Sequence, residues 1–290
     1  MPPVKPSTVL GRQLGDELRR FREAALLTTA DAAKVLDCTK GKISRLENGH
    51  VPLRLPDLNA LIAAYGIEDA TARERLTALT RRANRRRRDG WWHQYNSVLS
   101  DAYRDQIEME TICSRIRTFQ VQAVPGLLQT AEYARAVAVA SRGWDTPEEI
   151  EQVVQVRLHR QERLVGDDPM QFWAVLTEGV LHQQVGGPEV MADQLNALVA
   201  LADRPNVTIQ VLPFSSGAHA SMLGPYVLLG FPQPAALDLV LTETATGNTW
   251  IEREADVVRF QQLFDDARMT ALPPTESVAM IERIGTKTKP

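Results

Sequence analysis

The segment from Leu10 to Arg82 constrains the fold most, because it contains a succession of short helical patterns and no strand-like alternation. Leu14, Leu18 and Phe21 follow one another at spacings of four and three residues, which places them on one face of an α-helix. Short amphipathic helices bury such faces by packing them against one another. The sequence therefore predicts an all-α N-terminal domain.

Two short helices joined by a tight break follow the first one. Thr28 or Thr29 can cap the earlier helix and Thr39 the later one, because a threonine hydroxyl accepts a hydrogen bond from the free N–H groups of a first helical turn. The break falls at residues 37–38. The pair Asn48-Gly49 ends the later helix, since glycine supplies the positive φ that helix ends commonly need.

Two further helices, predicted over Leu55 to Tyr65 and Thr71 to Ala83, complete a bundle of five. An arginine run follows, because the segment from Arg81 to Arg88 holds six arginines in eight residues. We interpret this run as a domain boundary. The predicted organisation is an N-terminal domain over residues 1–83, an Arg-rich linker over 84–90 and a larger domain over 91–290.

The charge of the chain is divided unevenly. Residues 1–90 carry 18 Lys and Arg against 11 Asp and Glu, a net charge of +7, whereas the remaining residues carry 15 against 25, a net charge of −10. A basic segment on an acidic body is expected when only that segment meets a polyanion. Solvated surface charge can produce the same asymmetry, so the motifs decide between the two interpretations.

The larger domain mixes helical and strand-like segments. Four runs rich in Val, Leu and Ile and bounded by Gly or Pro predict strands: FWAVLT, VTIQVLP, YVLLGF and LDLVLTET. Helices are predicted over Gln129–Val139, Pro147–Leu164, Glu189–Ala202, Ala255–Thr270 and Glu276–Ile284. The expected fold class is an all-α five-helix domain followed by a larger α+β domain.

Composition argues against several classes of protein. A hydrophobic content of 44% in 290 residues suffices for two packed cores. The sequence has no run of about 18 apolar residues and its start lacks the apolar core of a signal peptide, so membrane insertion and export are not expected. Cys38 and Cys113 fit neither a disulfide scaffold nor a zinc-ligand spacing, which favours a cytoplasmic location.

The two short helices and their break have the spacing of a helix-turn-helix, whose second helix enters the major groove of DNA. On a helical wheel the second helix has Ile43, Leu46 and Glu47 on one side and polar or basic groups on the other. Arg45 is the best candidate for a bidentate contact with guanine. The predicted DNA-binding residues are Thr29, Thr39, Lys40, Gly41, Lys42, Ser44, Arg45, Asn48, Arg85, Arg86, Arg87 and Arg88.

Some of these residues have a second interpretation. Asn48 fits a helix end better than a base contact, and an individual lysine can be a solvated helix charge. The arginine run, instead of neutralising phosphates, can dock on the acidic larger domain and hold the N-terminal domain in one orientation.

The segment LRRFREAALLTTADAAKVLDCTKGKISRLENGHVPLRLPDLNALIAAYGI resembles a helix-turn-helix domain of the Xre or Cro/C-repressor type, most specifically in KISRLENG. The resemblance covers about Leu14 to Ile67 and implies a five-helix bundle that binds paired half-sites as a dimer. It also implies that Glu47 is structural and pairs with an arginine of the first helix, here Arg22. The break lacks the glycine frequent in the family, and Gly41 replaces a longer side chain that reads bases.

The rest of the chain is similar to an uncharacterised domain that follows an Xre-type domain in many actinobacterial regulators. The matching strings include GWWHQY, SRIRTFQVQAVPGLLQTAEYAR, RLHRQERL, WAVLTEGVL and RPNVTIQVLPFSSGAHASMLGPYVLL. This resemblance implies a small partner protein encoded nearby, in an arrangement described as toxin–antitoxin-like with this chain on the antitoxin or repressor side. It implies no small-molecule ligand.

No catalytic constellation is recognisable. The histidines His50, His93, His159, His182 and His219 are scattered, and the sequence has no H-E-x-x-H, G-x-S-x-G, Walker or G-x-G-x-x-G motif. The residues therefore predict no enzyme, cofactor or metal. An enzyme fused to a DNA-binding domain is the weakest of the hypotheses.

Two segments of the larger domain are candidates for recognition. Trp91, Trp92 and Tyr95 follow the arginine run and can either pack in a core or contact a partner, and the loop from Phe214 to Pro225 contains His219 and Met222. The leading hypothesis is a cytoplasmic, dimeric regulator whose larger domain binds a small protein that modulates DNA binding. The alternative is that this domain senses a small molecule.

Overall fold

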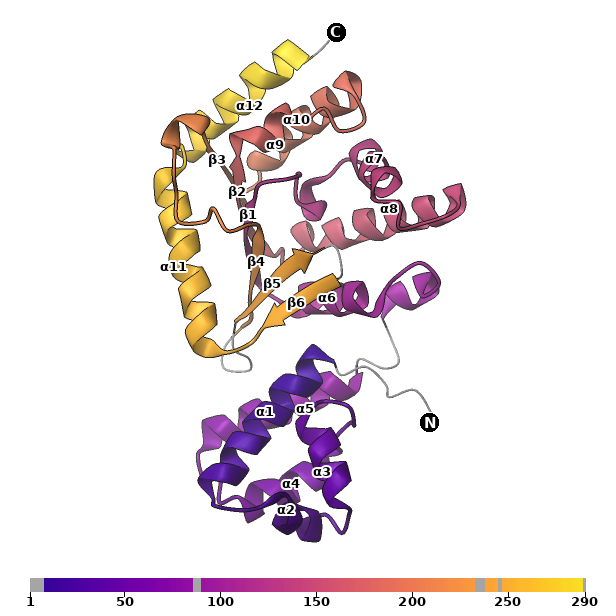
Figure 1. Cartoon of the computed structure of the whole chain (residues 1–290), viewed down its shortest axis with the longest axis vertical. Helices are drawn as coiled ribbons and strands as arrows, with labels where there is room; N and C mark the ends of the chain where they lie inside the picture. Colours follow the sequence, from indigo (N-terminus) through magenta and orange to yellow (C-terminus); the bar gives the residue numbers. More distant parts are fainter. Residues whose placement is uncertain (1–7, 86–89, 233–237, 245–246, 289–290) are drawn as a thin grey trace. The chain divides into compact units, whose positions relative to one another are not determined.

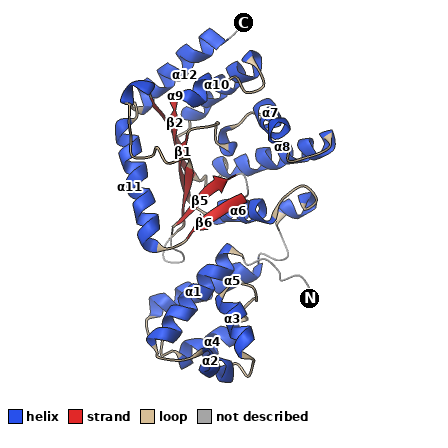
Figure 2. Cartoon of the chain, in the orientation of Figure 1, coloured by secondary structure: helices blue, strands red, loops and turns tan. Residues whose placement is uncertain are grey.

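The computed structural model describes residues 8–85, 90–232, 238–244 and 247–288. The chain divides into two compact units, which separate between His93 and Gln94. In Figure 1 the first unit is indigo to purple and the second runs from magenta to yellow. Figure 2 shows that the described part of the first unit has helices only, whereas the second combines helices with strands.

The first unit is a helical bundle, as the sequence predicts. Its helices are α1 (Val9–Ala24), α2 (Thr29–Val35), α3 (Lys40–Glu47), α4 (Leu55–Ala64) and α5 (Ala70–Arg85). Of the two candidate caps of α2, Thr28 is the cap and Thr29 is the first residue of the helix. Thr39 caps α3, as predicted. The helices share a core of buried side chains that includes Leu14, Leu18, Ile43, Leu46, Leu58, Leu61, Leu76 and Leu79.

The second unit contains a mixed sheet. Its strands are β1 (Arg115–Gln120), β2 (Gln171–Thr177), β3 (Val207–Leu212), β4 (Tyr226–Gly230), β5 (Leu239–Thr244) and β6 (Gly247–Ile251), in the order β3-β2-β1-β4-β5-β6. Strands β1, β2 and β3 are parallel to one another, and the pairs β1–β4, β4–β5 and β5–β6 are antiparallel. Strands β1, β2, β3 and β5 therefore run in the same direction, and their carboxyl ends lie at the same end of the sheet.

One face of the sheet is covered by α11 (Glu254–Thr270). Phe119 of β1, Tyr226 of β4 and Val240 of β5 pack with Phe264 of this helix, and all four side chains are buried. Because side chains alternate along a strand, the neighbours of Phe119 in β1 point to the opposite face. Figure 1 shows α11 along one side of the sheet and α6, α7, α8 and α10 on the other.

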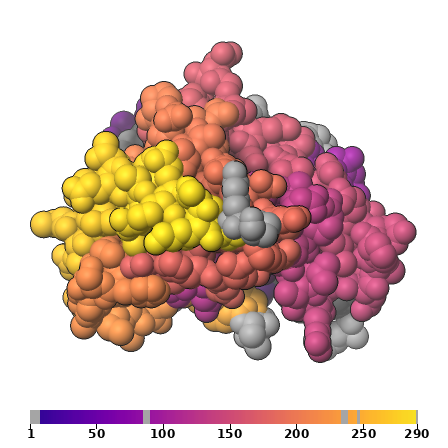
Figure 3. Space-filling view, turned by 90° about the horizontal axis from the view of Figure 1, so that it is seen from above, coloured from indigo at the N-terminus to yellow at the C-terminus, as the bar shows by residue number. Residues whose placement is uncertain are grey.

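The helices of the opposite side come mainly from the crossovers between parallel strands. They are α6 (Asp101–Ile112), α7 (Ala131–Ser141), α8 (Pro147–Gln161), α9 (Glu178–His182) and α10 (Pro188–Ala202). The second unit also has the short 3-10 turns η2 (Gly126–Leu128), η3 (Glu162–Leu164) and η4 (Phe214–Ser216), and the 3-10 turn η1 (Trp91–Tyr95) spans the division between the units. The last helix, α12 (Pro274–Thr288), packs on α10 and β3. It is yellow in the space-filling view of Figure 3, at the surface of the unit.

The predicted α+β fold is confirmed, although the sequence does not predict every element. The four apolar runs form β2, β3, β4 and β5, whereas β1 and β6 are not predicted. Strand β1 is not predicted because the arginines of its sequence, RIRTFQ, interrupt the apolar run. Arg115, at the start of β1, forms an ion pair with Asp238 at 2.9 Å. Helices α6 and α9 are also not predicted.

Candidate nucleic-acid interface

The turn between α2 and α3 is built from local hydrogen bonds. The Thr28 hydroxyl and the Asp31 carboxylate form a capping box that starts α2, and these hydrogen bonds lower the pKa of Asp31. The helix ends at Val35, and two residues later Asp37, whose φ is 45°, turns the backbone without a glycine. The next N–H, that of Cys38, donates to the carbonyl of Ala33 at 2.9 Å. These bonds fix the direction in which α3 begins.

Helix α3 has one buried face and one exposed face. The Thr39 hydroxyl accepts a hydrogen bond from the N–H of Lys42 at 3.2 Å and so caps the helix. Ile43, Leu46 and Glu47 are buried. The predicted DNA-binding residues of this helix that are exposed are Lys40, Gly41, Ser44, Arg45 and Asn48, together with the cap Thr39, while Lys42 and Thr29 are half-buried.

The predicted contact between Arg22 and Glu47 is confirmed. The Arg22 Nε lies 2.6 Å from Glu47 Oε1 and an Nη 3.0 Å from Oε2, with both side chains buried. Arg22 also donates to the carbonyl of Leu27 at 2.8 Å. The hydrogen bond to Glu47 raises the pKa of the Arg22 guanidinium. Glu47 therefore joins α3 to α1 from the buried face of α3.

A second arginine of α1, which sequence reasoning missed, also reaches this end of α3. Arg19 lies 3.4 Å from Glu47 Oε2 and donates to the side-chain oxygen of Asn48 at 2.9 Å. The Asn48 amide nitrogen donates to the carbonyl of Ser44 at 2.8 Å. Both ends of the Asn48 amide are thus used within the protein, as the helix-end interpretation of this residue requires.

Arg45 has a different environment from Asn48. It is exposed on α3, and no described residue forms an ion pair or side-chain hydrogen bond with its guanidinium group. Lys40 and Lys42 likewise form no ion pair with a described carboxylate, and α3 has no acidic residue in its first turn. The exposed face of α3 therefore presents positive charge and free hydrogen-bond donors next to a helix N-terminus.

The arginine run is described only in part. Arg81 and Arg82 belong to α5, where Arg81 is exposed and Arg82 is half-buried. Helix α5 ends at Arg85. Arg86, Arg87 and Arg88 lie outside the described residues, as does the side chain of Arg85, so their predicted contact with DNA stays a prediction.

The predicted recognition residues of the larger domain have unlike surroundings. Trp92 is buried and meets Trp91 edge to face, with ring centroids 5.8 Å apart, while Tyr95 is half-buried at the end of η1. His219 is half-buried against Phe119, at a centroid distance of 5.4 Å. Met222 is 66% exposed. Packing thus accounts for Trp92, whereas Met222 is accessible.

Among the described residues, no group of three or more His, Cys, Asp or Glu side chains could hold a metal ion. No described helix is both long and apolar enough to cross a membrane. Sequence reasoning also missed a buried ion pair of the second unit, in which Arg160 meets Glu110 at 2.6 Å. No sequence pattern signals this pair, because its residues come from different helices.

Comparison with known proteins identifies both units. Residues 13–76 match the family described as a helix-turn-helix domain, a class of DNA-binding domain. Residues 103–283 match the family described as a domain of unknown function, DUF5753. Neither the curated proteins nor the solved structures gave a match. Since residues 103–283 make up more than half of the 290 residues, the chain belongs to the DUF5753 family and carries a helix-turn-helix domain ahead of it.

Proposed function

We propose that this protein is a sequence-specific transcriptional regulator that inserts α3 into the major groove of DNA. The observation that carries the proposal is the contrast between the two sides of α3. Glu47 and Asn48 are held by arginines of α1, whereas Arg45 is exposed and its guanidinium group forms no hydrogen bond or ion pair with a described side chain. A free guanidinium on the exposed face of such a helix is suited to guanine O6 and N7.

The neighbouring residues divide into base contacts and phosphate contacts. Ser44 lies next to Arg45 on the exposed face and can hydrogen-bond to a base edge. Gly41 permits close approach, since a Cβ added there would meet only the Thr39 hydroxyl, at 3.9 Å. The remaining candidates, Thr29, Thr39, Lys40 and Lys42, are placed near helix starts, where N–H groups and side chains bind phosphates.

The resemblance to Xre-type regulators supports a more specific role. We infer that the protein acts in the cytoplasm as a homodimer on paired half-sites, as a repressor of the actinobacterial, antitoxin-like type. A dimer of helix-turn-helix domains places its two second helices about one turn of DNA apart, so its operator has two related half-sites. Mass measurement of the free and the operator-bound protein tests this, and a monomer on a single half-site would contradict it.

A second proposed function concerns a small protein partner of the DUF5753 domain. The loop from Phe214 to Pro225 supports it, because Phe214 and Met222 are each 66% exposed and Leu223 is 99% exposed. Neighbouring exposed apolar side chains are typical of interaction sites. If the partner binds this loop, the double substitution Met222→Lys and Leu223→Lys abolishes its co-purification, while Val258→Lys on α11 does not. Equal co-purification by the unsubstituted protein and both variants would contradict the proposal.

Alkylation of Cys38 tests DNA binding without a substitution in the interface. Cys38 is half-buried and directly precedes the cap of α3, whereas Cys113 is buried. Burial raises the pKa of the Cys113 thiol, so its reactive thiolate is scarce and Cys38 reacts first with iodoacetamide.

An operator selected from random DNA sequences is expected to slow the alkylation of Cys38, because the phosphates next to the start of α3 cover it. The control is the same length of DNA with a scrambled sequence, at a salt concentration that disfavours non-specific binding. Equal alkylation rates with the operator, with scrambled DNA and without DNA would contradict the proposed placement of α3.

A further inference from the structure

The DUF5753 domain contains a cavity of about 190 Å³ on the face of the sheet away from α11. Gln120 at the end of β1, Val227 at the start of β4 and Glu243 near the end of β5 are among the residues that line it. The chain leaves β1 through α7 and α8 toward β2, while β4 lies on the other side of β1. Such a switch in strand order, at the carboxyl end of a strand, is where α/β sheets commonly bind ligands.

One end of the cavity is closed by a neutralised pair. Arg160 of α8 donates to both oxygens of Glu110 of α6, at 2.7 and 2.6 Å, and to the Tyr103 hydroxyl at 2.6 Å. Arg160 and Glu110 are buried. A bidentate contact of this kind satisfies both charges. This end therefore has a structural role and offers a ligand no net charge.

Arg157, one helical turn before Arg160, is not neutralised in this way. It lines the same cavity and donates to Gln129 Oε1 at 2.6 Å, and no described carboxylate forms an ion pair with it. The Gln129 amide is itself held by the carbonyl of Val124, at 2.7 Å. A half-buried guanidinium whose described partner is a neutral amide is suited to an anionic group of a ligand.

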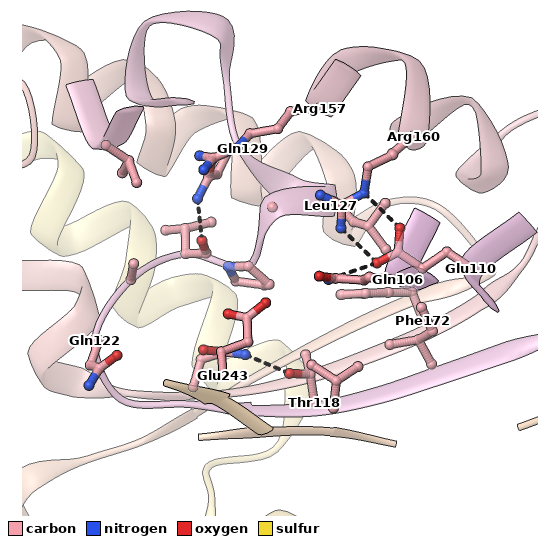
Figure 4. Close-up of a pocket in the computed structure, with 18 of the residues that line it drawn as sticks. Gln106, Glu110, Thr118, Gln122, Leu127, Gln129, Arg157, Arg160, Phe172 and Glu243 are labelled. Carbon is pink, nitrogen blue, oxygen red and sulfur yellow. Dashed lines mark hydrogen bonds and ion pairs between the residues drawn. The ribbon is translucent and has the colours of Figure 1, made fainter. Parts of the chain in front are cut away.

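A carboxylate faces the same space from the sheet. Figure 4 shows Glu243 on the strand side of the cavity and Arg157 with Gln129 on the helix side. Glu243 is exposed and forms no hydrogen bond or ion pair with a described side chain, Arg157 included. The cavity thus presents one positive and one negative group that do not satisfy each other. A ligand that carries both charges would satisfy both.

The lining of the cavity is partly apolar, and the cavity is small. Leu127 of η2 and Phe172 of β2 line it. The volume of about 190 Å³ is below the roughly 300 Å³ at which pockets for drug-sized molecules begin. We propose that the cavity binds a small zwitterion of the α-amino acid type, with its carboxylate on Arg157, its ammonium group near Glu243 and its side chain against Leu127 and Phe172. This proposal does not depend on DNA binding.

Binding of free amino acids to the full chain tests the proposal. Each proteinogenic amino acid is added at millimolar concentration, its effect on the melting temperature is recorded, and those that raise it are titrated by calorimetry. At least one is expected to bind, because a ligand that binds only the folded state raises the melting temperature. Its N-acetyl derivative and its primary amide, which each lack one charge, are expected to bind about tenfold more weakly or worse.

Matched variants test whether Arg157 and Glu243 bind the two charges of the ligand. Arg157→Gln and Glu243→Gln are each expected to weaken binding about tenfold or more, whereas Arg259→Gln and Glu254→Gln on α11 leave it unchanged. Failure of every amino acid to bind, or equal binding of the parent, N-acetyl and amide compounds, would overturn the proposal. If Arg157→Gln does not fold, the comparison of these compounds on the unsubstituted protein still decides.

Discussion

Glu47 fixes the position of α3 although it points away from the exposed face. It accepts hydrogen bonds from Arg22 at 2.6 and 3.0 Å and lies 3.4 Å from Arg19, so two arginines of α1 meet one carboxylate of α3. Burial of the Arg22–Glu47 pair makes each charge dependent on the other. The orientation of the exposed face of α3 thus depends on a carboxylate on its buried face.

Replacement of Arg22 tests this dependence. Arg22→Met leaves the buried Glu47 with only the partly exposed Arg19, and a broken buried pair costs about 3 to 5 kcal/mol. In the full chain we expect faster hydrogen exchange in α1 and α3 and a lower melting temperature for the first unit. Arg54→Met, which removes a pair with Asp57 from a side chain 79% exposed, is the control. Exchange in α3 equal to that of the control would show that the pair does not hold the helix.

The orientation of α3 also requires close packing of α1 against the end of α3. A Cβ added to Gly15 of α1 would lie 2.3 Å from the carbonyl oxygen of Glu47 and 2.8 Å from that of Leu46. Both neighbours are backbone atoms, so they can move only if α3 moves. Gly15 therefore permits the distance between these helices at which Arg22 reaches Glu47.

Two glycine substitutions separate packing from helix propensity. Alanine is favoured over glycine inside a helix by about 1 kcal/mol, so Gly41→Ala, in open space on α3, is expected to stabilise the first unit. Gly15→Ala gains the same propensity but displaces α3, and we expect a net loss of stability and of operator affinity. Thermal unfolding and DNA titration of both variants check this. A stabilising effect of Gly15→Ala would contradict the close packing.

Local patterns account for the elements that the sequence predicts, and long-range contacts account for those that it does not. The capping threonines and Gly49 act within one helical turn, which is why the start of α2 could be predicted to within one residue and the cap of α3 could be predicted as Thr39. Strand β1 escapes prediction because its first arginine, Arg115, is satisfied by Asp238, more than one hundred residues away. The cavity could not be predicted for the same reason, since α8 and β5 supply its two charged groups.

We expect the positive charge of the N-terminal part of the chain to act on DNA phosphates through the arginine run. If Arg85, Arg86, Arg87 and Arg88 neutralise phosphates beside the recognised groove, their replacement by serine reduces the magnitude of the slope of log affinity against log salt. The reduction is about 0.9 for each phosphate that is no longer neutralised. Operator affinity is measured for the full chain at several salt concentrations.

The matched control for the arginine run removes the same charge elsewhere. Serine replaces four of the exposed arginines of the second unit, Arg204, Arg253, Arg259 and Arg283, and the slope is expected to stay as it was. A slope unchanged by substitution of the run would rule out phosphate binding there and favour docking of the run on the acidic domain.

The assignment of α3 as the helix that reads the bases is tested by the effect of Arg45→Ala on discrimination between the selected operator and its single-base variants. If Arg45 binds one guanine, the substituted protein has about 1 to 3 kcal/mol less discrimination at that position and the same discrimination at the others. Lys42→Ala, on the same helix, is expected to weaken binding to all sequences alike and to reduce the magnitude of the salt slope by about 0.9. Equal weakening of operator and random-DNA binding by Arg45→Ala would contradict the assignment.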